Sequence, residues 1–235
     1  MSQELWKPTL NGTTALEKLL SDKGYESYSA LHQWSVNNPG EFWSRAWDDN
    51  SVIGSKGSIF YKEGADFISS QFFPEARLNV AENLLAHGEP DQVAIVSILE
   101  TGVRSEITWA ELRIKVAATA AAMRAEGVVS GDRIVAWVPN VAETVIYALG
   151  ALSIGAVVST ASPDFAPHAV EDRFGQVEPK ILLAVDGYYY NGKYFDCAEK
   201  SAEIEKLLPT LKKSVHISQF DEWIKPFIGS AANYE

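Results

Sequence analysis

The sequence is short of cysteine, histidine and positive charge. Its single cysteine, Cys197, excludes a disulfide within the chain and favours a reducing compartment. The four histidines stand at positions 32, 87, 168 and 216 without the paired spacing of a zinc site, so we expect no metal site. Twenty Lys and Arg against 31 Asp and Glu give a formal net charge of -11, which disfavours nucleic acids and anionic membranes as partners.

Long hydrophobic runs are also absent. The longest apolar tract, residues 145–158, is too short to cross a bilayer and contains Gly150, Ser153 and Gly155. The first eight residues have neither the basic start nor the apolar core of a signal peptide. We therefore expect a soluble, cytoplasmic protein.

Residues 1–90 are predicted to form a mainly helical arm that packs on the rest of the chain. The run from Asn38 to Glu41 supplies an N-cap, a proline at the first helical position and a glutamate that can close a capping box. Asn79 and Glu82 repeat that spacing. Residues 52–61 are punctuated by glycine and predict an irregular segment or a hairpin.

Residues 91–235 alternate between strand-like and helix-like patterns, which predicts an α/β fold with a mostly parallel, doubly wound sheet. The β-branched run at 156–161 is expected to be buried on both faces. Asn140 and Glu143 are expected to cap one helix, and Thr108 with Glu111 another. Strands are expected at residues 93–99, 103–108, 133–138, 156–161, 181–185 and 215–218, and helices at residues 108–127, 140–153, 167–176 and 197–208.

Three segments contain residue types found in active sites. Gly54 to Ser58 lacks the spacing of a phosphate loop, and no clear helix follows it. Ser162, Asp164 and His168 have the chemistry of a hydrolase triad but are close in sequence, and Asp164 is expected to serve the N-terminus of the next helix. The turn at residues 162–164 nevertheless follows a predicted parallel strand, where open α/β sheets bind ligands.

The segment from Asp186 to Lys193 permits two interpretations. Three consecutive tyrosines and a lysine follow a buried strand, so aromatic faces and one cation can meet a nucleobase and a phosphate. The alternative is a tight hairpin whose tyrosines pack against their neighbours. The pattern of residues does not separate the two.

Several stretches resemble the acetoacetyl-CoA synthetases of the adenylate-forming acyl-CoA synthetase superfamily. Residues 107–112, Ile-Thr-Trp-Ala-Glu-Leu, are similar to the first core motif of that superfamily, and residues 152–163 to its second. Further similar landmarks occur, in order, at residues 5–6, 30–36, 41–43, 52–57 and 76–85. The resemblance implies the N-terminal subdomain of an adenylate-forming enzyme, with residues 91–235 incomplete relative to the family.

The resemblance also implies a reaction and its cofactors. Acetoacetate, ATP and CoA would give acetoacetyl-CoA, AMP and pyrophosphate, with magnesium. The family's phosphate loop, its ribose-binding aspartate and its catalytic lysine would lie beyond Glu235, in the remainder of the synthetase chain. We therefore expect no catalytic residue and no tightly bound cofactor in this part.

Four residues are implied to face CoA. By the same resemblance, Ser162 and Pro163 stand where acetyl-CoA synthetases have a Phe-Gly pair, and Tyr190 and Lys193 where they have arginines. Lys193 keeps the positive charge, whereas Tyr190 does not. A phosphate contact is thus expected at Lys193.

Three alternatives stay open at this point. The chain can be a truncated paralogue that serves as a binding or dimerisation module, or part of a ligase for another short-chain carboxylate. A flavodoxin-like nucleotide binder is a third, but it would need a glycine-rich or hydroxyl-rich loop after the first parallel strand, where Val138, Pro139 and Asn140 stand.

Overall fold

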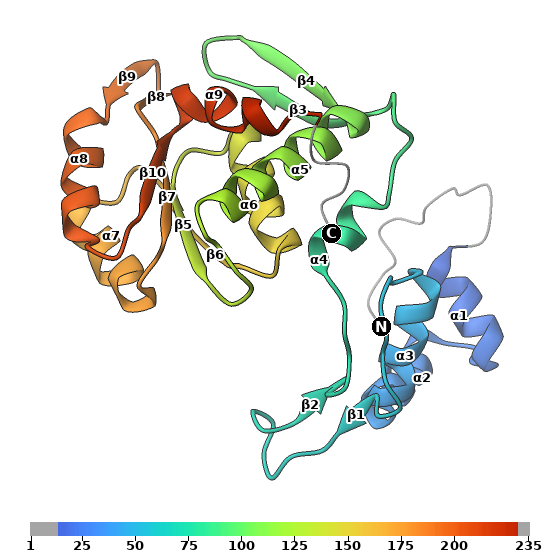
Figure 1. Ribbon diagram of the computed structural model, residues 1–235. Helices are drawn as coiled ribbons and strands as arrows, with labels where there is room; N and C mark the ends of the chain where they lie inside the picture. The colour runs from blue at the N-terminus through green and yellow to red at the C-terminus, as the bar shows by residue number, and fades with distance from the viewer. Residues whose placement is uncertain (1–13, 230–235) are drawn as a thin grey trace. The chain divides into compact units, whose positions relative to one another are not determined.

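The computed structural model describes residues 14–229 and forms two compact units, which meet in sequence between Leu78 and Asn79 (Figure 1). The landmark at Leu5 and Trp6 lies outside the described residues.

The first unit is mainly helical. Thr14 caps α1 in a capping box with Glu17, and Gly24 ends this helix with φ +70°. The predicted box at the start of the third helix is absent, because the Asn38 amide donates to the Trp34 carbonyl at 2.9 Å instead of accepting from the helix. The elements of this unit are α1 (Ala15–Lys23), α2 (Tyr28–Asn37), α3 (Pro39–Asp49), and the antiparallel pair β1 (Tyr61–Lys62) and β2 (Gln71–Phe72).

The second unit confirms the predicted α/β fold. Its elements are α4 (Val80–Leu85), β3 (Val93–Ile98), β4 (Arg104–Thr108), α5 (Trp109–Ala125), β5 (Arg133–Trp137), α6 (Ala142–Ser153), β6 (Val157–Ala161), α7 (Pro167–Phe174), β7 (Ile181–Ala184), β8 (Gly187–Tyr190), β9 (Lys193–Asp196), α8 (Ala198–Leu207), β10 (Lys213–His216) and α9 (Phe220–Ile224). Short 3-10 turns follow α7, β10 and α9.

Four parallel strands form the sheet, in the order β10-β7-β5-β6. Alternate residues of β5 and β7 enter two separate cores, as expected for side chains that alternate across a strand. Helices α5, α6 and α9 contribute to one core, and α7 and α8 to the other. The sheet is therefore covered on both faces. In Figure 1, α7 and α8 lie on one side of the sheet, and α5 and α6 lie on the other.

Strand β6 corrects one expectation. Its side chains are not all buried, and Val157 is 52% exposed. The reason is its position, because an edge strand has a neighbouring strand on one side only, whereas β5 and β7 have neighbours on both. The β-branched composition predicted a strand correctly but not its place in the sheet.

Two boundaries also differ from prediction. Helix α6 begins at Ala142 after Val141, without a side-chain cap, because Asn140 lies at the centre of a tight turn in which the Val141 amide donates to the Pro139 carbonyl. Strand β10 covers Lys213–His216, two residues earlier than expected, because it aligns with β7 from Ile181 onward. Thr108 and Glu111 do form the predicted capping box of α5.

Candidate functional site

The segment after β7 is a tight hairpin made of β8 and β9. Asn191 and Gly192 form its turn with φ +50° and +72°, and two left-handed residues are what a two-residue hairpin of type I′ needs. The register pairs Tyr188 with Phe195, Tyr189 with Tyr194 and Tyr190 with Lys193. The hairpin geometry is thus confirmed, but Tyr190 does not pack as that interpretation expects, because it is 61% exposed beside an exposed Lys193.

The hairpin has two distinct faces. Directly paired residues share a face and successive residues alternate, so Tyr188, Phe195, Tyr190 and Lys193 share one face. Tyr188 stacks on Phe195 there, with ring centroids 5.4 Å apart and an interplanar angle of 18°. Tyr189 and Tyr194 meet on the opposite face, 5.1 Å apart.

A hydrogen bond joins the hairpin to the turn after β6. The Tyr188 hydroxyl donates to Asp164 Oδ1 at 2.6 Å, and this bond raises the pKa of Tyr188 to about 12, with a smaller contribution from burial. Ser162 Oγ donates to Asp164 Oδ2 at 3.2 Å. Asp164 therefore links the turn after β6 to the hairpin. The prediction that it serves the N-terminus of α7 is wrong, since that helix begins after Ala166 without a side-chain cap.

The structure thus brings together the turn and the hairpin that contain the four predicted residues. Ser162, Tyr190 and Lys193 are exposed, whereas Pro163 is buried. The hydrolase interpretation is not supported, because His168 lies 3.3 Å from Glu171 and is not hydrogen-bonded to Ser162 or Asp164. The predicted residues exposed at this edge supply one cation, one aromatic ring and one hydroxyl, and the exposed carboxylate of Asp164 lies beside them.

A cavity of about 350 Å³ lies along the opposite face of the hairpin. The order of the strands reverses here, because β6 pairs with one edge of β5 and β7 with the other. Open α/β sheets bind ligands at such switch points. Its walls come from the β3–β4 turn, the β5–α6 loop, the end of β7, Ile217 after β10, and the hairpin residues Gly187, Tyr188, Tyr189 and Tyr194. Sequence reasoning missed the contribution of the β3–β4 turn, in which Glu100 Oε2 accepts from the Gly192 amide at 3.2 Å across 92 residues of sequence.

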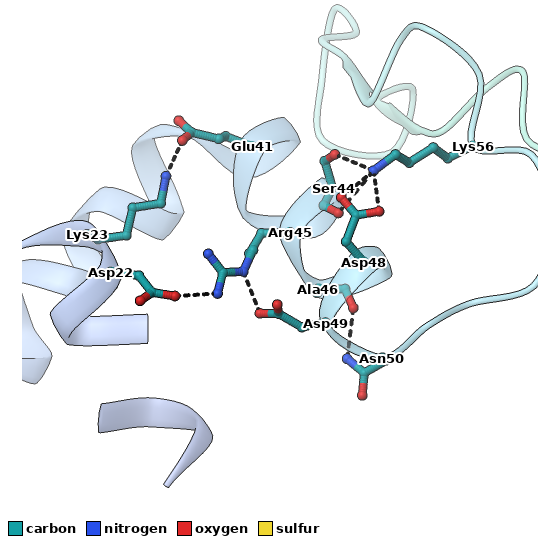
Figure 2. A network of polar contacts seen from close by, with 10 residues as sticks. All are labelled: Asp22, Lys23, Glu41, Ser44, Arg45, Ala46, Asp48, Asp49, Asn50 and Lys56. Carbon is teal, nitrogen blue, oxygen red and sulfur yellow. Dashed lines mark hydrogen bonds and ion pairs between the residues drawn. The ribbon is translucent and has the colours of Figure 1, made fainter. Parts of the chain in front are cut away.

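The glycine-rich segment Gly54 to Ser58 has no free cation for a phosphate. Figure 2 shows Lys56 pointing to Asp48, and the ammonium nitrogen lies 2.7 Å from each carboxylate oxygen. It also donates to Ser44 Oγ at 3.1 Å. In the same network Arg45 lies 2.6 Å from Asp22 and from Asp49, so positive charge is matched by carboxylates. This segment is therefore part of the structure of the first unit.

Within residues 14–229 no group of histidine, cysteine and carboxylate side chains is arranged to hold a metal ion. In the same range no helix has the length and apolarity needed to cross a membrane.

Comparison with known proteins gives consistent matches. Residues 84–233 match the family described as AMP-binding enzyme, and residues 28–84 match the acetyl-coenzyme A synthetase N-terminus. The acetoacetyl-coenzyme A synthetase of Rhizobium meliloti (strain 1021) is 42% identical over 187 residues, which are 79% of this chain and 28% of that protein. The acetoacetyl-CoA synthetase of Xenopus tropicalis is 44% identical over 194 residues, 81% of this chain and 29% of that protein.

A solved structure agrees with these matches. The acetoacetyl-CoA synthetase from Streptomyces lividans superposes with a TM-score of 0.79 at 36% identity, covering 84% of this chain and 32% of that one. The chain spans less than a third of the length of each of these three proteins. Because the family match covers most of the sequence and the fold agrees, the chain belongs to the AMP-binding enzyme family.

Proposed function

We propose that this chain is the N-terminal portion of an ATP-dependent acetoacetate–CoA ligase, which joins acetoacetate and CoA and releases AMP and pyrophosphate. The observation that carries the proposal is the identity of 42% and 44% to acetoacetyl-CoA synthetases over about four fifths of the chain. Residues 1–90 would be the arm of the synthetase, and residues 91–235 an incomplete α/β subdomain. The cytoplasm is the expected location.

The hairpin and the turn after β6 would form part of the CoA-facing surface. Lys193 can pair with a phosphate, and the exposed ring of Tyr190 beside it can stack on a purine. Ser162 adds a hydroxyl at the same edge, while the buried Pro163 would shape the turn instead of touching the ligand. These residues suit CoA binding and supply no group for adenylation.

ATP and magnesium would be held by the remainder of the synthetase chain. An adenylation site needs hydrogen-bond donors or cations for the phosphates and oxygen ligands for the metal. The acyl-adenylate that forms there has AMP as a good leaving group. Among residues 14–229 the sequence lacks a phosphate loop and no metal-holding group is present. The acyl-adenylate chemistry is thus assigned outside this chain.

Exposed apolar side chains of the β3–β4 hairpin favour the proposal that this chain is part of a longer protein. A two-stranded sheet is weak alone, and this one exposes Val96 and Ile98, with Val103 exposed in the turn between its strands. A truncated paralogue acting as a separate module would be expected to carry polar residues where the rest of the family domain packs. We propose that further synthetase chain covers these apolar side chains.

The first test is activity. The chain mixed with acetoacetate, ATP, magnesium and CoA should release no pyrophosphate above background, because the proposal assigns the adenylating groups to the remainder of the synthetase. The Streptomyces lividans enzyme assayed in parallel is the positive control. Turnover at a rate typical of enzymes, about 1 s⁻¹ or more, would overturn the assignment of roles.

The second test is binding. Titration of the ¹⁵N-labelled chain with CoA should shift the amides of Tyr190 to Lys193, with a Kd of about 1 mM or weaker. Dephospho-CoA should bind less well, because it lacks the phosphate that Lys193 would meet. Lys193→Glu should weaken CoA binding by about fivefold, and the exposed Lys206→Glu on α8 is the matched control. Equal binding of the two ligands, or shifts at residues 54–58 instead, would argue against this surface.

A further inference from the structure

The turn after β6 and the hairpin after β7 are not neighbours in the sheet. Strand β5 lies between β6 and β7, so the two segments start about 10 Å apart, two strand spacings. Backbone pairing cannot join segments across an intervening strand. A surface built from both segments therefore needs a side chain long enough to connect them.

Tyr188 is that side chain. It reaches from strand β8 to Asp164 Oδ1, and 2.6 Å is short for a hydroxyl donor, as expected for a bond to a carboxylate. The Tyr188 ring and the Asp164 carboxylate each make a second contact. Phe195 stacks on the Tyr188 ring, and Ser162 Oγ donates to the other Asp164 oxygen.

The bond also determines which face of the hairpin meets the turn. Tyr188 shares its face with Tyr190 and Lys193, and Tyr189 lies on the opposite face against the cavity. Of the three consecutive tyrosines, Tyr188 donates to Asp164 and also borders the cavity, whereas Tyr189 borders the cavity from the face opposite Lys193. Tyr190 is the tyrosine exposed on the Lys193 face, with Gly192 beside it held by Glu100.

We infer that Tyr188 and Asp164 are positioning residues of the CoA-facing surface, which connect the hairpin to the turn after β6 so that Tyr190 and Lys193 are oriented before a ligand arrives. The inference rests on the proposed function. It assigns no contact with CoA to Tyr188. Preorganisation of this kind strengthens binding by reducing the ordering that binding requires.

The experiment removes single atoms from the wild-type chain. Tyr188→Phe deletes the hydroxyl and keeps the stacked ring, so the Kd for CoA should rise about two- to tenfold, as for one lost hydrogen bond. Tyr28→Phe, which removes a hydroxyl from an exposed ring of α2 in the first unit, is the matched control and should leave the Kd unchanged. The melting temperature should change by no more than a few degrees in either variant.

A double-mutant cycle tests the partner. Tyr188→Phe should have no further effect on the Kd when Asp164 is already alanine, whereas Asp164→Asn, which keeps an acceptor, should restore most of the wild-type affinity. Additive effects of Tyr188→Phe and Asp164→Ala would overturn the inference. An unchanged Kd for Tyr188→Phe, in a wild-type chain that does show CoA shifts at Lys193, would overturn it while leaving the proposed function intact. A wild-type chain without any such shifts would overturn the proposed function, and the inference with it.

Discussion

The two units of this chain are stabilised in different ways. Among the described residues before Asn79, Leu31 is the only buried apolar side chain. The helices and strands of that unit are held together instead by edge-to-face aromatic contacts, such as Trp43 with Phe72, and by ion pairs, such as Arg45 with Asp22. The second unit has two apolar cores on the two faces of a parallel sheet.

This difference predicts unequal stability. Burial of apolar surface is the dominant favourable term in folding, at about 25 cal/mol per Å², whereas exposed ion pairs contribute little. The second unit should therefore fold by itself, and the first should depend more on its surroundings.

Hydrogen exchange should separate the two units most clearly. Amides of β5 and β7 should exchange only through global unfolding, because both strands have neighbours on both sides and enter both cores. Amides of α1 should exchange orders of magnitude faster, since that helix has no buried residue. Exchange followed by NMR measures this, and equal protection in α1 and β7 would contradict the comparison.

Core truncation should come next. Leu183→Ala in β7 should lower the free energy of unfolding by about 2–5 kcal/mol, because Leu183 is fully buried and the surrounding sheet cannot collapse into the space. Leu31→Ala in the first unit is the control, and the helices around it can adjust more easily. Urea denaturation of both variants gives the comparison. A larger loss for Leu31→Ala would show that the first unit has the tighter core.

The glycines that end helices offer a matched pair. Gly24 follows α1 with φ +70° and Gly155 follows α6 with φ +74°, so alanine at either position pays backbone strain of about 1–2 kcal/mol. A Cβ at Gly155 would lie 2.6 Å from Ser130 Oγ, whereas nothing lies within 4 Å at Gly24. Gly155→Ala should therefore be the more destabilising in thermal melts, and an equal loss would mean that Ser130 moves aside freely.

The smallest effect concerns two carboxylates. Asp132, 8% exposed, accepts from Lys180 Nζ at 2.5 Å and from the Val129 amide at 2.7 Å, and these bonds hold its pKa below the usual value. Asp132→Asn should cost about 1 kcal/mol at pH 7, the difference between a charge-assisted and a neutral hydrogen bond. Asp22→Asn in the first unit, where Arg45 lowers the pKa of an exposed carboxyl, should cost less.

The pH dependence of that effect follows from the direction of the shift. A carboxyl with a lowered folded pKa binds fewer protons in the folded state, so its contribution is present above the unfolded pKa of about 3.9 and is lost as the pH falls through the folded pKa. The difference in stability between wild type and Asp132→Asn should therefore disappear in acid. A constant difference from pH 7 to pH 2 would show that the loss is steric.

The sequence by itself determined the elements of the second unit and the family. Capping boxes, glycines at helix ends and β-branched runs are local signals, so Thr108 and Glu111 and the strands near residues 134 and 182 were predictable without tertiary information. The Asn-Gly turn of the hairpin is equally local, since both residues tolerate positive φ.

Only the tertiary structure decided how these elements combine. Whether a β-branched run is central or at an edge depends on strand order, which is why the burial of β6 was predicted wrongly. Asp164 was predicted to cap the nearest helix. It instead accepts a hydrogen bond from a residue 24 positions away, because the fold places the Tyr188 hydroxyl within 2.6 Å. Local patterns set the conformation of each segment, while contacts between distant segments depend on how the chain closes around its two cores.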